Sequence, residues 1–147
     1  MTYKAHSFCI VCIANYCRSP VLENLLKRKY SEKFEIMSAG LSPIPQPSMD
    51  IRSMQFLESL GIKNIVHTPK RISKKMLNDC DYFIAVDLLV LIELNKLFPK
   101  YKEKFKLATS QFKNIELNDP YMFGPREYKD IMTNIQFVSE NIDLELL

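Results

Sequence analysis

Short apolar runs alternate along the chain with longer segments in which apolar residues recur every three or four positions. Residues 7–11 and 82–86 are uncharged, rich in aliphatic and aromatic side chains, and bounded by polar or turn-forming residues. Both runs are typical of strands that are buried on both faces. Residues 34–37 and 105–108 are weaker candidates of the same kind. The pattern therefore predicts four short strands, of which residues 82–86 form the clearest.

Helical periodicity fills most of the sequence between these runs. Ser19 and Pro20 are typical of an N-cap and a first helical position, and the amphipathic pattern continues to about residue 33. Residues 41–48 contain three prolines and predict a loop. Asn118 begins an Asp-Pro turn. Further helices are expected over residues 50–60, 72–79 (with Ser73 as cap), 88–98 and 125–142.

Strands that alternate with helices in this way indicate an α/β fold with βαβ units. We expect a small doubly wound, Rossmann-like, four-stranded parallel sheet with helices on both faces. The 147 residues fit a single domain over residues 1–147. Sheets of this kind bind ligands beyond the carboxyl ends of their strands.

Composition and charge narrow the function classes. The chain is 47% hydrophobic and 25% charged, which is typical of a globular protein, and its net charge of +3 is too small and dispersed to indicate a nucleic-acid partner. No apolar stretch is long enough to cross a membrane. The apolar run from Phe8 to Ala14 is at the short limit for a secretory signal, and Asn15 and Arg18 follow it instead of a cleavage site. A soluble cytoplasmic protein is expected.

The four cysteines lie at positions 9, 12, 17 and 80. This distribution differs from that of a secreted disulfide framework, and the two histidines, His6 and His67, complete no zinc-binding pattern. We therefore expect no metal and no cofactor. The cluster of three cysteines is either structural or catalytic, and its surroundings must decide.

Those surroundings are the turn between the first strand and the first helix. Consecutive backbone N–H groups that lead into a helix N-terminus form a cradle for an anion. Arg18 adds a planar partner for phosphate oxygens. The same positive field stabilises a thiolate, so Cys12 is a candidate nucleophile toward a bound phosphoryl group.

Three other polar residues could support this chemistry. Ser19 is placed to hydrogen-bond a thiolate at Cys12, and Asn15 tolerates the left-handed conformation that a tight loop needs. A leaving alkoxide or phenoxide needs a proton, and Asp119 is the candidate acid. Asp119 equally fits an ordinary Asp-Pro turn.

Together these residues resemble the low-molecular-weight protein tyrosine phosphatases, over essentially the whole chain. The resemblance is carried by the segments Val11-Cys12-x-x-Asn15-x-Cys17-Arg18-Ser19-Pro20, Ser38-Ala39-Gly40, Gly61-Ile62 with His67 and Arg71, Val86-Asp87 and Asp119-Pro120-Tyr121. It implies a phosphatase that acts on a phosphotyrosine-containing protein or a small aryl phosphate, with tyrosine kinases among the candidate substrates.

The resemblance also implies a role for each site residue. Cys12 would form a phosphocysteine, Arg18 would bind the phosphate oxygens, and Asp119 would protonate the leaving group and then activate water. Loop residues would bind phosphate through their backbone or support the loop, and Tyr121 would flank the substrate ring. Cys17 resembles a second loop cysteine that can form a reversible disulfide with the nucleophile. The binding and supporting residues are Ile13, Ala14, Asn15, Tyr16, Cys17, Ser19, His67 and Tyr121.

Two departures from the family pattern leave alternatives open. Ala14 stands where the family usually has glycine, and residues 41–48 offer only Ile44 and Gln46 where many members carry an aromatic wall. One alternative is a non-catalytic phosphate- or phosphotyrosine-binding module. Another is a thiol-dependent arsenate reductase, which needs two further relay cysteines, for which Cys80 is a single candidate.

Overall fold

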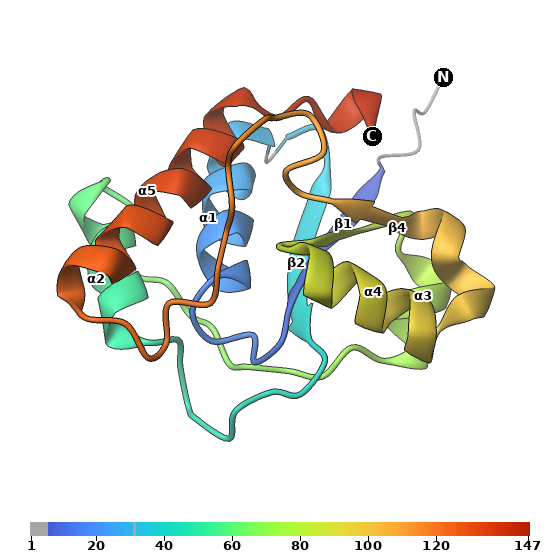
Figure 1. Ribbon diagram of the computed structural model, residues 1–147, viewed down its shortest axis with the longest axis horizontal. Helices are drawn as coiled ribbons and strands as arrows, with labels where there is room; N and C mark the ends of the chain where they lie inside the picture. The colour runs from blue at the N-terminus through green and yellow to red at the C-terminus, as the bar shows by residue number, and fades with distance from the viewer. Residues whose placement is uncertain (1–5, 31) are drawn as a thin grey trace.

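The protein folds around a four-stranded parallel sheet (Figure 1). The structure is a computed structural model that describes residues 6–30 and 32–147. The strand order is β2-β1-β3-β4, with every neighbouring pair parallel. The strands are β1 (Ser7–Cys12), β2 (Glu35–Gly40), β3 (Tyr82–Ala85) and β4 (Phe105–Leu107). The predicted α/β class and the four parallel strands are confirmed.

Helices cover both faces of the sheet. The helices α1 (Ser19–Tyr30), α2 (Ile51–Ser59) and α5 (Pro125–Asn141) pack together on one side, and α3 (Lys74–Asp79) and α4 (Leu88–Leu97) lie on the other (Figure 1). Two short 3-10 helices, η1 (Pro99–Lys104) and η2 (Leu144–Leu146), complete the chain. The two layers leave the carboxyl ends of β1 and β3 at one edge, where the loops of the site converge.

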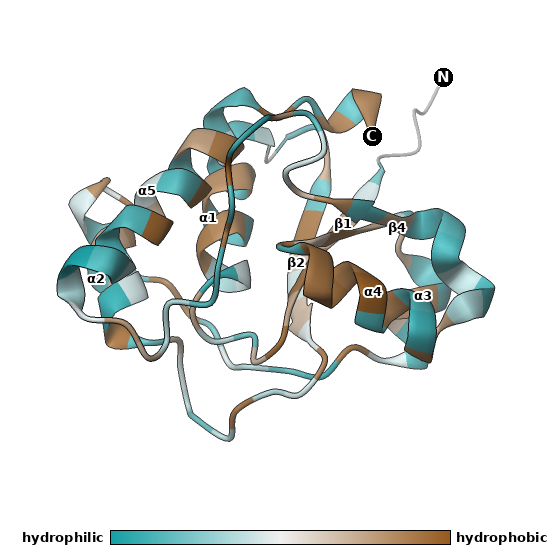
Figure 2. Cartoon of the chain, in the orientation of Figure 1, coloured by the Kyte–Doolittle hydropathy of each residue, from teal (hydrophilic) through white to brown (hydrophobic). Residues whose placement is uncertain are grey.

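The core explains why β1 is the fixed element of the site. All six of its residues are buried, and the apolar side of α1 packs against it. Large side chains such as Phe8, Ile10 and Phe83 are at most 1% exposed, which makes their displacement costly. Hydrophobic colour accordingly concentrates inside the molecule, although α4 also shows an outward apolar side (Figure 2). No helix in the described ranges combines the length and apolarity needed to cross a membrane.

Several boundaries differ from the sequence prediction. Helix α1 ends at Tyr30 instead of about residue 33, because the amides of Lys33 and Phe34 both donate to the Tyr30 carbonyl and close the helix with a turn. The strand predicted over residues 34–37 runs on to Gly40, because its pairing with β1 continues to Cys12. The 3-10 helix η1 was not expected. Residue 31 and the N-terminal residues 1–5 that lead into the predicted first strand lie outside the described residues.

The predicted cap of α1 is also wrong. The helix begins at Ser19 itself, and the amides of Val21 and Leu22 donate to the Arg18 carbonyl. The Ser19 hydroxyl is engaged elsewhere, with Cys12 and Asn15, so it is not available to cap the helix. The cap predicted at Ser73 is confirmed, since its hydroxyl accepts a hydrogen bond from the amide of Met76.

Candidate active site

Cys12 is the last residue of β1, and its sulfur lies at the floor of the turn that follows. The Asn15 amide donates to Cys12 Sγ at 3.2 Å, and Ser19 Oγ lies 2.9 Å from the same atom. The cysteine is only 2% exposed. The Cys12 sulfur therefore has two polar partners, one of which is the Ser19 hydroxyl.

Asn15 holds the turn in its shape. Its φ of 53° lies in the left-handed region, which asparagine tolerates better than most residues. Its side-chain amide donates to Ser19 Oγ at 2.7 Å and to Ser38 Oγ at 3.0 Å, and its Oδ1 accepts from the Lys70 amide at 3.0 Å. The predicted conformation of Asn15 is thus present, and three segments of the chain converge on it.

A second layer of polar residues lies behind Asn15. Nε2 of His67 lies 2.8 Å from the Asn15 carbonyl oxygen, so this nitrogen carries the hydrogen. The other ring nitrogen lies 4.0 Å from the buried carboxylate of Glu23, which also accepts from Ser38 and Lys27. Burial lowers the pKa of His67, although its hydrogen bond to Asn15 and the charge of Glu23 oppose this shift. This layer supports the loop without entering the pocket.

Arg18 is buried and anchored at one of its two terminal nitrogens. Its Nη1 donates to Asp87 Oδ2 and to the Leu117 carbonyl, the latter at 2.7 Å. Asp87 is itself held in place as the N-cap of α4, where it accepts from the Val90 amide. Among the described residues no hydrogen bond engages Nε or Nη2 of Arg18. A bidentate pair of donors therefore remains for an oxyanion.

Cys12 and Arg18 line one pocket of about 300 Å³. Asp119 also lines it, so the structure brings the candidate acid to the pocket that contains the candidate nucleophile. The aromatic rings of Tyr16 and Tyr121 meet edge to face with centroids 6.1 Å apart. Of the two residues considered for the wall in the proline-rich loop, Ile44 lines the pocket and Gln46 does not. The lining residues are Cys12, Ala14, Tyr16, Cys17, Arg18, Ser42, Ile44, Asp119 and Tyr121.

Ala14 and Gly40 differ in how much room their surroundings leave for a methyl group. Ala14 is not among the described residues with a positive φ, so its methyl group causes no strain in the backbone. Gly40 faces the loop so closely that a Cβ atom would lie 2.7 Å from the Ile13 carbonyl oxygen and 3.0 Å from the Asn15 amide nitrogen. The turn can therefore accept alanine at position 14, whereas its neighbour in β2 must be glycine.

The other three thiols differ in their distance from the pocket, which Cys17 lines and the other two do not. Burial raises the pKa of Cys17 to about 12, so this thiol stays protonated near neutral pH. Cys9 and Cys80 are buried, and neither lines the pocket. An arsenate reductase would need relay thiols near the nucleophile, and Cys80 instead contacts the sulfur of Met37. In the part of the chain that the structure describes, no three metal-ligating residues come together.

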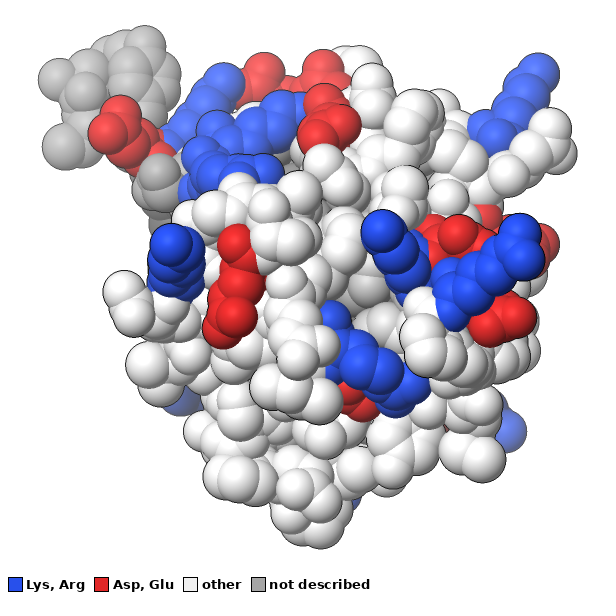
Figure 3. All heavy atoms as spheres, turned by 90° about the vertical axis from the view of Figure 1, so that its left-hand side faces the viewer, with Lys and Arg blue, Asp and Glu red and all other residues white. Residues whose placement is uncertain are grey.

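The surroundings of the pocket mouth are apolar. Charged side chains crowd the upper part of the face shown in Figure 3, whereas its lower end, toward the loop after β2, is nearly free of them. Large apolar side chains are exposed in the loop after β1 and just after Asp119, namely Ile13, Tyr121, Met122 and Phe123. Such a rim fits the side chains around a modified residue better than it fits a small hydrophilic ion.

The fold and the pocket together define the class as phosphatases that use a cysteine at the end of the first strand of a parallel sheet. The model of the low molecular weight phosphotyrosine protein phosphatase family matches residues 7–145, and the chain belongs to this family. The predicted family and type of enzyme are thereby confirmed.

Three similar proteins illustrate the match. The low molecular weight protein-tyrosine-phosphatase Ptp of Acinetobacter johnsonii is 34% identical over 128 residues, which cover 86% of this chain and 88% of that protein. The crystal structure of the Erwinia amylovora tyrosine phosphatase AmsI superposes with a TM-score of 0.84 at 23% identity, covering 93% of this chain and 90% of that one. The YwlE arginine phosphatase of Geobacillus stearothermophilus has the same fold, with a TM-score of 0.83, 20% identity and coverage of 92% and 88%.

Sequence reasoning gave no role to several residues of the site. Gly40 and Asp87 appeared only as parts of the family resemblance, and Leu117 contributes through its backbone alone. Glu23 looked like one charged residue among several on a helix, yet it is 7% exposed. Arg52 carried no signal in the sequence beyond its position in a predicted helix.

Proposed function

We propose that this protein hydrolyses phosphotyrosine in proteins through a phosphocysteine intermediate. In the first step the Cys12 thiolate attacks phosphorus and the bond from phosphorus to the tyrosyl oxygen breaks. The leaving oxygen takes a proton from the carboxyl group of Asp119. The free donors of Arg18 and the backbone N–H groups of the loop stabilise the charge on the equatorial oxygens.

In the second step water replaces sulfur on phosphorus. The Asp119 carboxylate, now deprotonated, takes a proton from the attacking water. The sulfur–phosphorus bond breaks, and the thiolate returns to its contacts with Ser19 and the Asn15 amide. The cycle releases inorganic phosphate and needs no external cofactor.

One observation carries the proposal: Cys12 and Asp119 line a single pocket that has tyrosine rings in its wall. An ionised carboxylate repels a bound phosphate, so an acidic residue in this pocket favours turnover over simple binding of an anion. The sulfur is almost fully buried, and a long, flat tyrosyl group can present phosphate at the pocket floor more easily than a short seryl group. The rings of Tyr16 and Tyr121 can pack against the ring of an aryl substrate.

The natural substrate is proposed to be a phosphotyrosine-bearing protein, with autophosphorylated tyrosine kinases as the candidates that the resemblance indicates. The first test is hydrolysis of p-nitrophenyl phosphate with EDTA present, using the wild type, Cys12→Ser and Asp119→Ala. We expect no turnover by Cys12→Ser and a loss of about 10²–10³-fold in Asp119→Ala. A wild type that binds vanadate but does not turn over would instead identify a binding module.

A second arm of the test distinguishes the substrate class. Matched peptides that carry phosphotyrosine, phosphoserine or phosphoarginine are compared by the release of phosphate. We expect kcat/KM to be highest for phosphotyrosine, and to fall with Tyr16→Ala for that peptide more than for the other two. A preference for phosphoarginine would overturn the assignment of substrate while leaving the cysteine chemistry intact.

A further inference from the structure

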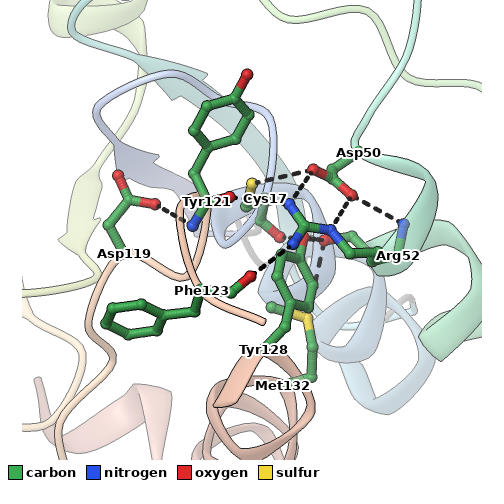
Figure 4. A network of polar contacts seen from close by, with 9 residues as sticks. Cys17, Asp50, Arg52, Asp119, Tyr121, Phe123, Tyr128 and Met132 are labelled. Carbon is green, nitrogen blue, oxygen red and sulfur yellow. Dashed lines mark hydrogen bonds and ion pairs between the residues drawn. The ribbon is translucent and has the colours of Figure 1, made fainter. Parts of the chain in front are cut away.

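Arg52, in the first turn of α2, joins parts of the chain that lie far apart in the sequence (Figure 4). Its Nε and Nη2 donate to the two carboxylate oxygens of Asp50 at 3.0 and 2.9 Å. Its Nη2 also donates to the Tyr121 carbonyl and its Nη1 to the Phe123 carbonyl, both at 3.1 Å. One guanidinium thus holds a carboxylate on one side and the backbone around Tyr121 and Phe123 on the other.

The guanidinium is fixed in position by its surroundings. Its central carbon lies 4.0 Å from the centre of the Tyr128 ring, and the Tyr128 hydroxyl is held by Ser53. Burial alone would raise the pKa of Asp50, but the hydrogen bonds from Arg52 outweigh it and the pKa is lowered. Both partners are therefore charged at neutral pH, and their bonds are of the stronger, charge-assisted kind.

Asp50 connects this arrangement to the phosphate-binding loop. The Asp50 amide donates to the Tyr16 carbonyl at 3.0 Å, and the Cys17 thiol contacts the Asp50 carboxylate at 3.8 Å. One turn further along α2, the Ser53 hydroxyl donates to the Cys17 carbonyl at 2.8 Å. The start of α2 is consequently fixed relative to the loop that contains Cys12.

The segment of residues 118–123, called here the acid segment, has few polar attachments of its own. The Tyr121 amide donates to Asp119 and the Phe123 amide to the Pro120 carbonyl, and both of these bonds stay inside the segment. Pro120 is buried and the Tyr121 ring touches Tyr16, which provides packing. Among the described residues, the hydrogen bonds that join the acid segment to another element both come from Arg52.

We propose that Arg52 is a positioning residue that sets where Asp119 stands relative to Cys12. Its guanidinium links the carbonyls of Tyr121 and Phe123 to the carboxylate of Asp50. Asp50 is itself hydrogen-bonded to the phosphate-binding loop. An arginine is needed because its planar fork supplies three donors in fixed directions, whereas a lysine offers a single charged point. The inference rests on the proposed function, because it assumes that Asp119 is the general acid.

Loss of Arg52 should therefore affect mainly the step in which the leaving group is protonated. If the acid is misplaced, kcat/KM should fall more for a poor leaving group, which depends strongly on protonation, than for a good leaving group. Binding of an oxyanion at the loop should be unaffected. A role in general stability would instead lower the activity toward every substrate alike.

The test compares phenyl phosphate, which has the poorer leaving group, with p-nitrophenyl phosphate. We measure kcat/KM for both, and the inhibition constant of inorganic phosphate, in Arg52→Met and Arg52→Lys. Each substitution is also made together with Asp119→Ala. Arg28→Met is the matched control, because Arg28 also donates to a backbone carbonyl, that of Leu60, but at the far end of α2. Thermal melting of each variant checks folding.

In Arg52→Met we expect the ratio of kcat/KM for phenyl phosphate to that for p-nitrophenyl phosphate to fall about tenfold. Arg52→Lys should give a smaller fall, which also provides the answer if the methionine variant does not fold. Arg28→Met should leave the ratio unchanged. In the Asp119→Ala background the Arg52 substitutions should lower the ratio no further, since the group they position is gone.

Two results would overturn the inference. One is an equal loss with both substrates, and the other is a further fall of the ratio in the Asp119→Ala background. A failure of the proposed function gives a different result, since Asp119→Ala alone would then leave the ratio unchanged. The two failures are therefore distinguishable in one set of measurements.

Discussion

The phosphate-binding loop and the acid segment face each other across one pocket, yet they are held in different ways. The loop of residues 12–19 is mostly buried. Asn15 donates hydrogen bonds to α1 and β2 and accepts hydrogen bonds from residues 67–70. Asp119 and its neighbours are largely exposed, and Arg52 supplies their polar link to the rest of the fold. The first region is preorganised by many contacts and the second by few.

This difference matches the demands of the chemistry. A cradle for an oxyanion works only if its donors are already aimed when charge develops, so rigidity there lowers the barrier. A proton donor must also let product leave and water enter, and an exposed segment held by two hydrogen bonds from one side chain permits this. We therefore expect substitutions in the loop to cost more than equivalent substitutions in the acid segment.

A glycine beside each region, Gly40 next to the loop and Gly124 after the acid segment, gives the largest contrast. In Gly40→Ala the new methyl group would lie 2.7 Å from the Ile13 carbonyl oxygen, so the loop must move. We expect turnover of p-nitrophenyl phosphate to fall about 100-fold, as a misplacement on the order of 1 Å can cause. In Gly124→Ala the methyl group meets only the flexible end of Glu127, at 3.2 Å, and turnover should stay within about twofold. Equal losses in the two variants would show that the loop and the acid segment are equally constrained.

Two asparagines test the same contrast through stability. Asn15→Ala removes three hydrogen bonds and places alanine at a φ of 53°, so the free energy of unfolding should fall by about 2 kcal/mol. Asn118→Ala removes only an exposed contact with Glu116 and should cost less than about 0.5 kcal/mol. Urea denaturation measures both. A stable Asn15→Ala variant with normal activity would contradict the picture of a loop fixed by this side chain.

Asp50 and Arg52 join the two regions, and their ion pair should make the free energy of unfolding depend on pH in the acid range. The pKa of Asp50 is lowered in the fold, so its stabilising contribution is present above the unfolded value of about 3.9 and is lost as pH falls through the folded value. The wild type should therefore lose more unfolding free energy between pH 5 and pH 3 than Asp50→Asn does. Asp130→Asn, at an exposed position of α5, should keep the acid dependence of the wild type. Identical curves of unfolding free energy against pH for all three proteins would show that the ion pair of Asp50 adds nothing to stability.

The smallest effect is expected at Ala14. Its backbone needs no positive φ and its methyl group lines the pocket, so glycine there should change kcat/KM for p-nitrophenyl phosphate by less than about threefold. A gain of tenfold or more in Ala14→Gly would show that the methyl group obstructs phosphate. That result would also weaken the view that the loop is already arranged for its ligand.

Much of the fold could be predicted because its determinants are local. Apolar runs placed three of the strands closely, and 3.6-residue periodicity placed the five helices within a few residues. The loop from Cys12 to Ser19 could also be predicted, since nucleophile, anion cradle and arginine lie within eight consecutive residues between a strand and a helix. The prediction was wrong where strand pairing continues beyond the local pattern. The last residues of β2 belong to the strand because they pair in register with β1.

The partners of each site residue could not be found in the same way. Arg18 is anchored by Asp87, 69 positions away, and by a backbone carbonyl that any residue type could supply. Gly40 is required because the phosphate-binding loop lies close to it, and Arg52 because its guanidinium reaches the backbone of the acid segment. None of these contacts has a periodic or local signature.

The elements, the parallel α/β fold and the chemistry expected at Cys12 and Arg18 could be predicted from residue type and short-range spacing. Only the folded chain reveals that Asp119 lines the same pocket, that Tyr16 and Tyr121 also line it, and that Arg52 links the acid segment to the loop. Those facts depend on how distant segments pack against one another. Packing is set by the sum of many contacts over the whole core, and it cannot be read from neighbouring residues.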